Sequence, residues 1–134
     1  MLQDRLVKTA SEVRLAAHAP YSKFCVGAAL LTKSGNVFVG CNVENISLRL
    51  TICAEQPAVA AAVAAGETDF VAIAVVADSK EPAMPCGACR QVLAEFNPSI
   101  EITSSTVDGR TETVSLSELL PRPRQGILES FRDV

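Results

Sequence analysis

The chain has 134 residues, 49% of them hydrophobic, and its 12 Lys plus Arg and 15 Asp plus Glu give a net charge of -3. This composition excludes an intrinsically disordered chain and predicts one domain, residues 1–134, with a sizeable core. The negative charge and the scattered Lys and Arg argue against a nucleic-acid partner, because nucleic-acid binding normally rests on clustered basic residues.

The apolar runs are shorter than the roughly 20 residues that a membrane span needs, so no membrane partner is expected. The first residues, MLQDRLVKTA, alternate charged with apolar side chains and indicate an amphipathic helix rather than a signal peptide. The five cysteines are an odd number, which argues against a disulfide framework in such a chain. We therefore expect a cytoplasmic protein.

Hydrophobic periodicity and turn residues predict the elements of the chain. In order they are a helix over Leu2–Ala17, a hairpin of strands over Cys25–Thr32 and Val37–Cys41, a helix over Ala54–Ala65, a buried strand over Phe70–Asp78, a helix over Gly87–Phe96, strands over Ile100–Ser105 and around Thr113, and a short last helix. Gly66 is expected to close the second helix, and Ser115 with Glu118 to form a capping box. This order predicts a three-layer α/β domain with a mixed sheet.

The stretch TICAEQPAV, Thr51–Val59, places a cysteine two residues before a glutamate at a helix start. Pro57 is tolerated in the first turn, where backbone N–H groups have no intrahelical partner, so it fixes the helix start near Cys53. In PCGAC, Cys86 and Cys89 lie about one turn apart at the start of the next helix. All three thiols are therefore predicted at helix amino termini, where the partial positive charge favours thiolates.

These cysteines have several interpretations. Cys is among the most buried residue types, and an isolated C-x-x-C is also consistent with a redox pair. Three thiolates form an incomplete tetrahedral zinc shell, whose open fourth position is typical of a catalytic site. A structural site that recruits Cys25 or Cys41 as a fourth ligand competes with it; otherwise these two are predicted to be core residues. Glu55 favours the catalytic interpretation, because a structural site has no use for a carboxylate there, although a surface glutamate remains an alternative.

C-A-E at Cys53–Glu55 and P-C-x-x-C at Pro85–Cys89 resemble the signature of the zinc deaminases in a three-cysteine form. APYSKF at Ala19–Phe24, GAALLT, GCNVEN at Gly40–Asn45 and PCGACRQVLAEF are similar to the small cytidine deaminases, and this resemblance covers nearly the whole chain. It implies an α-β-α sandwich with a five-stranded mixed sheet, Zn²⁺ as the cofactor, and a homotetramer whose active sites are shared between subunits.

The resemblance implies that the chain deaminates cytidine and 2'-deoxycytidine to uridine and 2'-deoxyuridine, in pyrimidine salvage. Cys53, Cys86 and Cys89 would hold the zinc that activates a water molecule. Glu55 would move protons from this water to the ring nitrogen and to the departing ammonia.

The resemblance also implies the substrate-binding residues. Asn42 and Glu44 resemble a ribose-binding pair, whose donors and acceptors suit sugar hydroxyls, although such residues are also common in a turn after a strand. Phe24 resembles the aromatic that stacks on the base, and a core phenylalanine is the plain alternative. His18 is expected to be a helix C-cap.

Three positions depart from the family pattern. Gln56 stands where many members have an arginine that donates to the ligand thiolates; it keeps a donor but brings no positive charge. Leu48 stands where a tyrosine is common. Arg124 lies near the place of a phenylalanine that stacks from a neighbouring subunit, and an arginine can also lie flat on a ring. These departures bear on the substrate range.

Other functions stay open. A related small deaminase would act on N4-substituted cytidines or on an amino-nucleoside antibiotic such as blasticidin S, and Glu44 argues against the antibiotic because a ribose-binding acid fits an unmodified sugar. A polynucleotide deaminase would need a basic channel, against which the net charge argues. A zinc-stabilised binding module would leave Glu55, Asn42 and Glu44 without a role.

Overall fold

The computed structural model describes residues 1–125, and the end of the predicted domain, residues 126–134, lies outside the described residues. The predicted order of helices and strands is confirmed. The elements are α1 (Leu2–Val13), β1 (Val26–Thr32), β2 (Val37–Cys41), α2 (Glu55–Ala64), β3 (Phe70–Ala77), α3 (Gly87–Phe96), β4 (Glu101–Thr106), β5 (Thr111–Ser115) and α4 (Leu116–Leu119), with 3-10 turns at Arg14–Ala16 and Leu48–Leu50. Within residues 1–125, every helix is too short or too polar to cross a lipid bilayer.

The strands form a five-stranded mixed sheet in the order β2-β1-β3-β4-β5. The predicted hairpin is confirmed, with Gly27 of β1 opposite Cys41 of β2. β3 and β4 are parallel, and the other neighbouring pairs are antiparallel. A parallel pair needs a crossover connection, which α3 supplies. The carboxyl ends of β3 and β4 therefore lie at the same edge of the sheet, where the chain leaves β3 toward α3.

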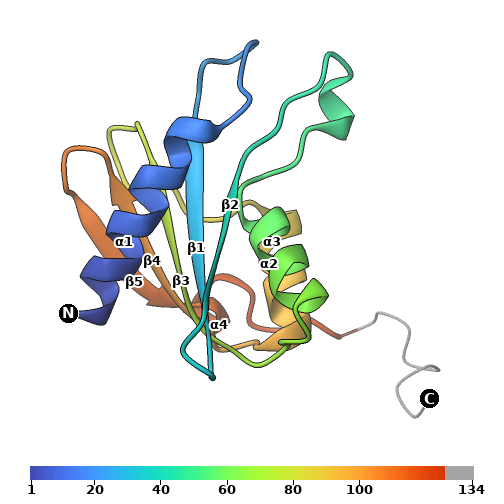
Figure 1. Cartoon of the computed structure of the whole chain (residues 1–134). Coiled ribbons are helices and arrows are strands. Elements are labelled where there is room, and N and C mark those ends of the chain that lie inside the picture. The colour runs from blue at the N-terminus through green and yellow to red at the C-terminus, as the bar shows by residue number, and fades with distance from the viewer. Residues whose placement is uncertain (126–134) are drawn as a thin grey trace.

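Helices cover both faces of this sheet, with α1 on one face and α2 and α3 on the other (Figure 1). Alternate residues of β1 face the two layers, as the pleat of a strand requires. Ala29 packs with Leu6 of α1 in the smaller cluster, whereas Leu30 packs with Leu93 of α3 in the larger one. The predicted three-layer α-β-α sandwich is confirmed.

The first helix ends earlier than the sequence predicts. α1 stops at Val13 and is followed by the 3-10 turn Arg14–Ala16, after which Ala17 is extended with ψ of 140°. The backbone of His18 then pairs with Val43, which follows β2. The expected cap at His18 is therefore wrong, because this pairing uses the backbone groups that a longer helix would bond internally.

Two helix ends follow the expected capping residues. Gly66 has φ of 84°, a left-handed conformation that suits glycine, and its N–H donates to the Val63 carbonyl at 2.9 Å, so it closes α2 as predicted. Ser115 caps α4, and its hydroxyl accepts from the Ser117 N–H at 3.3 Å. A capping box would use the N–H of Glu118, so the cap bond forms one residue earlier than predicted.

Gly40 near the end of β2 allows the backbone of α2 to lie directly on the sheet. A Cβ atom at Gly40 would lie 2.2 Å from the Ala54 carbonyl oxygen and 2.7 Å from the Ala58 nitrogen. No side chain larger than hydrogen fits between the two elements. This contact places the start of α2 beside the residues that follow β2.

We expect Gly40→Ala to lower the free energy of unfolding by about 1–3 kcal/mol or more, because the added methyl group overlaps backbone atoms that cannot move independently. Urea denaturation measures the change. Gly87→Ala is the matched control, since a Cβ there would meet nothing within 4 Å. Equal unfolding midpoints for the two variants would contradict the close contact at Gly40.

Candidate functional site

A cavity of 270 Å³ lies where the start of α2, the loop before α3, and the segments that precede β1 and follow β2 come together. Most of the residues that the sequence singles out lie in its wall: Phe24, Asn42, Glu44, Cys53, Glu55 and Cys86. The segments 17–25 and 42–52 extend side by side at the same end of the molecule (Figure 1), and the pairing of His18 with Val43 joins them. The fold therefore gathers residues that are far apart in the sequence.

Three cysteines form a cluster at this cavity. The sulfur atoms of Cys53, Cys86 and Cys89 lie within 4.8 Å of one another; Cys86 is 3.8 Å from Cys53 and 3.4 Å from Cys89. A tetrahedral zinc with bonds of about 2.3 Å places its sulfur ligands about 3.8 Å apart, so the donor set and its spacing fit Zn²⁺. Cys25 and Cys41 lie outside the cluster and are half-buried. Within residues 1–125 the structural site with four cysteines therefore lacks its fourth ligand.

The helix starts hold these thiols as the sequence predicts. Cys53 directly precedes Ala54, the N-cap of α2, and Cys86 is the N-cap of α3. The start of α3 is further fixed by Arg90, whose Nε donates to the Pro85 carbonyl at 2.7 Å. The partial positive charge of both helix starts is therefore directed at the cluster, where it favours thiolates.

The thiols influence the ionisation of one another. A hydrogen bond from Cys89, supported by one from Cys86, lowers the pKa of Cys53 to about 6. Donating this bond, together with burial, raises the pKa of Cys89 above its ordinary value. Cys53 therefore loses its proton more readily than Cys89, and it is the thiolate form that binds a metal.

Glu55 is the first residue of α2, and its side chain is only 4% exposed. The alternative of a surface glutamate is therefore wrong. Burial is the largest cause that raises the pKa of this carboxyl, to about 7, and the charge on Cys53 acts in the same direction. A carboxyl with a pKa near neutrality can both accept and donate a proton, which is the requirement for general acid–base chemistry.

Gln56 keeps the donor role that the sequence predicts for it. Its Nε2 donates to the sulfur of Cys89 at 3.7 Å. The amide supplies a neutral hydrogen bond where an arginine would supply a charged one, so the thiolate cluster gains less electrostatic stabilisation here.

Asn42 directly follows β2, is 7% exposed, and joins the end of that strand to the entry of β1. Its Oδ1 accepts from the Val26 N–H at 2.8 Å, and its Nδ2 donates to the Phe24 carbonyl at 2.7 Å. An amide has two N–H groups and two lone pairs, so one of each remains beyond these bonds for another partner. Asn42 thus shapes the cavity wall in addition to lining it.

The carboxylate of Glu44 holds the segment before Phe24 in place. It accepts from the backbone N–H groups of Tyr21 and Ser22, at 3.0 and 3.1 Å, and from the Ser22 hydroxyl. The bond from the Ser22 hydroxyl is the largest cause that lowers the pKa of Glu44. The sequence identified Glu44 but missed Ser22, whose only signal was its position within the APYSKF motif.

Other cavity residues carry no recognisable signal in the sequence. They include Thr51, Val75, Ala83 and Met84. Two departures from the family pattern lie apart from the cavity lining. Leu48 is 73% exposed in its 3-10 turn, and Arg124 donates from Nη2 to the Glu95 carbonyl of α3 at 3.2 Å.

Residues 2–103 match the family model described as the cytidine and deoxycytidylate deaminase zinc-binding region. The chain belongs to this family. The match spans all three cysteines, Glu55, Asn42, Glu44 and Phe24. For a member of this family, a zinc ligand role explains the cysteine cluster better than a redox pair does.

Proteins that are named cytidine deaminases align with most of this chain. Cytidine deaminase of Halalkalibacterium halodurans is 49% identical over 122 residues, covering 90% of this chain and 92% of the relative. Cytidine deaminase of Sporosarcina psychrophila is 45% identical over 119 residues, with 88% of each covered. The crystal structure of cytidine deaminase from Burkholderia pseudomallei is 47% identical and superposes with a TM-score of 0.87, covering 90% of this chain and 98% of that one.

We expect the purified protein to contain one zinc per chain, and Cys53→Ala to lose it, because two thiols cannot retain the ion as three do. Elemental analysis after dialysis measures the content. Cys41→Ala is the matched control and should keep its zinc, since Cys41 lies outside the cluster. Release of zinc by Cys41→Ala would instead favour a site with four cysteines.

Proposed function

We propose that this chain hydrolyses cytidine and 2'-deoxycytidine to uridine and 2'-deoxyuridine and releases ammonia, with one Zn²⁺ bound per chain. The observation that carries the proposal is the buried carboxyl of Glu55, which lines the same cavity as Cys53 and Cys86 of the three-thiol cluster. Membership in the cytidine and deoxycytidylate deaminase family supports it.

The reaction adds the oxygen of water to the amino-bearing ring carbon and breaks the bond from that carbon to nitrogen. Cys53, Cys86 and Cys89 would hold the Zn²⁺, which would supply the Lewis acid that activates the water. Glu55 accepts one proton from the water and delivers it to the adjacent ring nitrogen. It then takes the second proton, from the hydroxyl group now on the ring carbon, and passes it to the departing amine, so that the carbonyl of uridine forms as ammonia leaves. Its place in the first turn of α2, at 4% exposure, keeps this carboxyl out of bulk water.

We assign the other end of the cavity to the sugar and the base. Glu44, whose carboxylate stays ionised, offers acceptors to ribose hydroxyls, and the remaining N–H of Asn42 offers a donor. Phe24 is 41% exposed and lines the cavity, where its ring gives the base an apolar surface. In this assignment the bonds from Tyr21 and Ser22 to Glu44 hold the carboxylate in position before the nucleoside binds.

We further propose a homotetramer in which neighbouring subunits complete the sites. The segment from Val43 to Ile52 exposes Ile46 by 81%, Leu48 by 73% and Leu50 by 63%. Large apolar side chains exposed within one short segment are typical of an interaction surface. The segment continues directly into Cys53, so a subunit that covers it would lie beside the cavity.

We propose that the enzyme acts in the cytoplasm, in the salvage of pyrimidine nucleosides. All five cysteines are free, which suits a reducing compartment, and the site takes a free nucleoside. A zinc-stabilised binding module without activity is the weaker alternative, because it gives no reason for a carboxyl that is buried at a helix start.

Glu55→Gln should keep its zinc and lower the turnover of cytidine at least about 100-fold, because it preserves size and hydrogen bonding but removes the proton carrier. The fall in absorbance when cytidine becomes uridine measures turnover. Glu95→Gln, the same substitution at an exposed position of α3, should leave the rate unchanged. A Glu55→Gln protein with nearly wild-type turnover would remove Glu55 from the mechanism.

Light scattering should give four times the 14.2 kDa mass of one chain. Leu48→Asp combined with Leu50→Asp should lower this mass, because both charges would be buried between subunits without partners. Val107→Asp is the control. Val107 is exposed in the turn after β4, and β1 and β3 separate β4 from β2, which the 43–52 segment follows. A mass that stays at four chains in the Leu48 and Leu50 variant would contradict the assignment of this surface.

A further inference from the structure

The loop over residues 78–85 connects β3 to the three-cysteine cluster but has no regular structure. It ends at Cys86, and two of its residues, Ala83 and Met84, line the cavity. The mechanism above uses neither side chain. Both are partly exposed, so they form a wall that faces the cavity rather than a part of the core.

The position of this wall decides which part of a substrate it meets. Ala83 and Met84 lie three and two residues before Cys86, so they border the cysteine end of the cavity. If the proposed function holds, the reacting ring carbon lies at this end, because Glu55 and the thiols are there. The amino group on that carbon, and any substituent on its nitrogen, then lies against the Ala83–Met84 wall.

A buried hydroxyl on β4 bonds to the backbone of this wall. Ser104 is 1% exposed, and its Oγ donates to the Ala83 carbonyl at 2.7 Å. Ser104 lies opposite Val75 of β3 in the sheet, and Val75 itself lines the cavity. The strand pairing therefore fixes the hydroxyl of Ser104 next to the cavity wall. A buried hydrogen bond to a loop without internal structure fixes the loop where no helix or strand does so.

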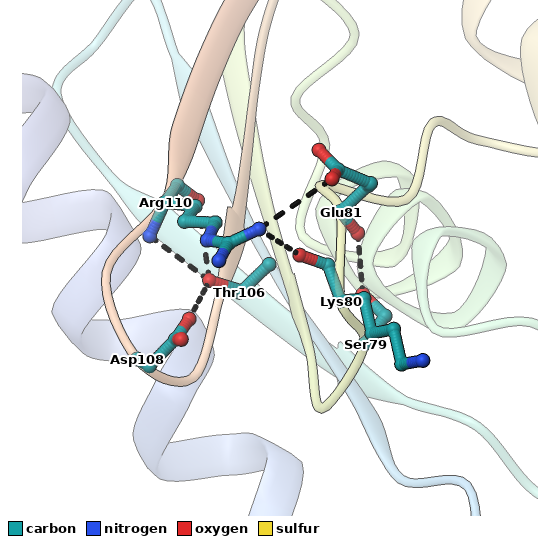
Figure 2. A network of polar contacts seen from close by, with 6 residues as sticks. All are labelled: Ser79, Lys80, Glu81, Thr106, Asp108 and Arg110. Atoms are coloured by element: carbon teal, nitrogen blue, oxygen red, sulfur yellow. Dashed lines mark hydrogen bonds and ion pairs between the residues drawn. The ribbon is translucent and has the colours of Figure 1, made fainter.

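A second set of contacts holds the same loop further from the cavity. Arg110, after the turn that leaves β4, donates from Nη1 to the Lys80 carbonyl at 3.0 Å and pairs with Glu81 at 3.4 Å (Figure 2). Thr106 accepts from the Arg110 N–H at 2.9 Å and so fixes the turn itself. Arg110 and Glu81 are 60% and 81% exposed, so this pair contributes less than the buried bond of Ser104.

We propose that the Ala83–Met84 wall determines the size of the substituent accepted on the departing nitrogen, and that Ser104 is the positioning residue that holds this wall. This inference rests on the proposed function and specifies which residues set the substrate selectivity of that function. An N4-alkyl cytidine would react with water as cytidine does, so that the ring carbon gains oxygen and the bond to nitrogen breaks. The products are uridine and the alkylamine in place of ammonia. Met84, with its flexible thioether, is the side chain that an added methyl group meets.

The test compares kcat/KM for cytidine and for N4-methylcytidine in purified, zinc-containing protein. Met84→Ala should raise the ratio of N4-methylcytidine to cytidine activity about tenfold, since one methylene in a pocket changes rates on that scale. Ser104→Ala should raise the same ratio about threefold or more, the scale of one lost hydrogen bond.

Ser105→Ala is the matched control for Ser104→Ala. Ser105 is the next residue of β4, is 2% exposed, and donates to the Thr106 carbonyl instead of to the loop. Its ratio should equal that of the wild type. Met84→Ala, at a partly exposed position, tests the wall even where Ser104→Ala fails to fold.

Ratios within twofold of the wild type in both Met84→Ala and Ser104→Ala would overturn the inference, as would an equal shift in Ser105→Ala. Loss of cytidine turnover in Met84→Ala would also overturn it, because the wall would then serve the reaction itself rather than selectivity. A wild-type protein that converts neither nucleoside would instead overturn the proposed function, so the two failures are distinguishable.

Discussion

The site depends on the direct contact between Gly40 in β2 and the backbone of α2. Because the carbonyl of Ala54 lies where a side chain would be, the start of α2 meets the end of β2 without a spacer. That contact brings Cys53 and Glu55 to the residues that follow β2. The crossover through α3 brings Cys86 to the same edge of the sheet, so two helix starts converge on one cavity.

This convergence places ionisable groups so close together that their charged forms repel one another when no metal is bound. Three thiols lie within 4.8 Å of one another, and a carboxyl that burial keeps partly protonated lies beside them. A bound zinc ion would replace the thiol protons and compensate the charges of the thiolates, so metal binding would be coupled to the stability of this part of the fold. The neutral amide of Gln56, which donates to Cys89, leaves more of that compensation to the helix termini and the ion.

Much of the fold could be predicted because its signals are local: turn residues such as Gly66, short apolar runs for the strands, and a proline that is tolerated only in a first helical turn. The clustering of the three cysteines could be predicted for the same reason, since they mark two helix starts. The premature end of α1 could not, because it follows from the pairing of His18 with Val43. The hydrogen bond from Ser104 to Ala83 could not be predicted from the sequence either, since these residues meet only through the pairing of β3 with β4.

The central claim is that three thiols from two helix starts hold one zinc with an open position beside Glu55. X-ray absorption at the zinc edge of the purified protein tests it directly. The account predicts three sulfur ligands at about 2.3 Å and one lighter ligand, oxygen or nitrogen, at about 2.0 Å. A shell of four sulfur atoms would contradict the account, because it would close the position that the reaction needs.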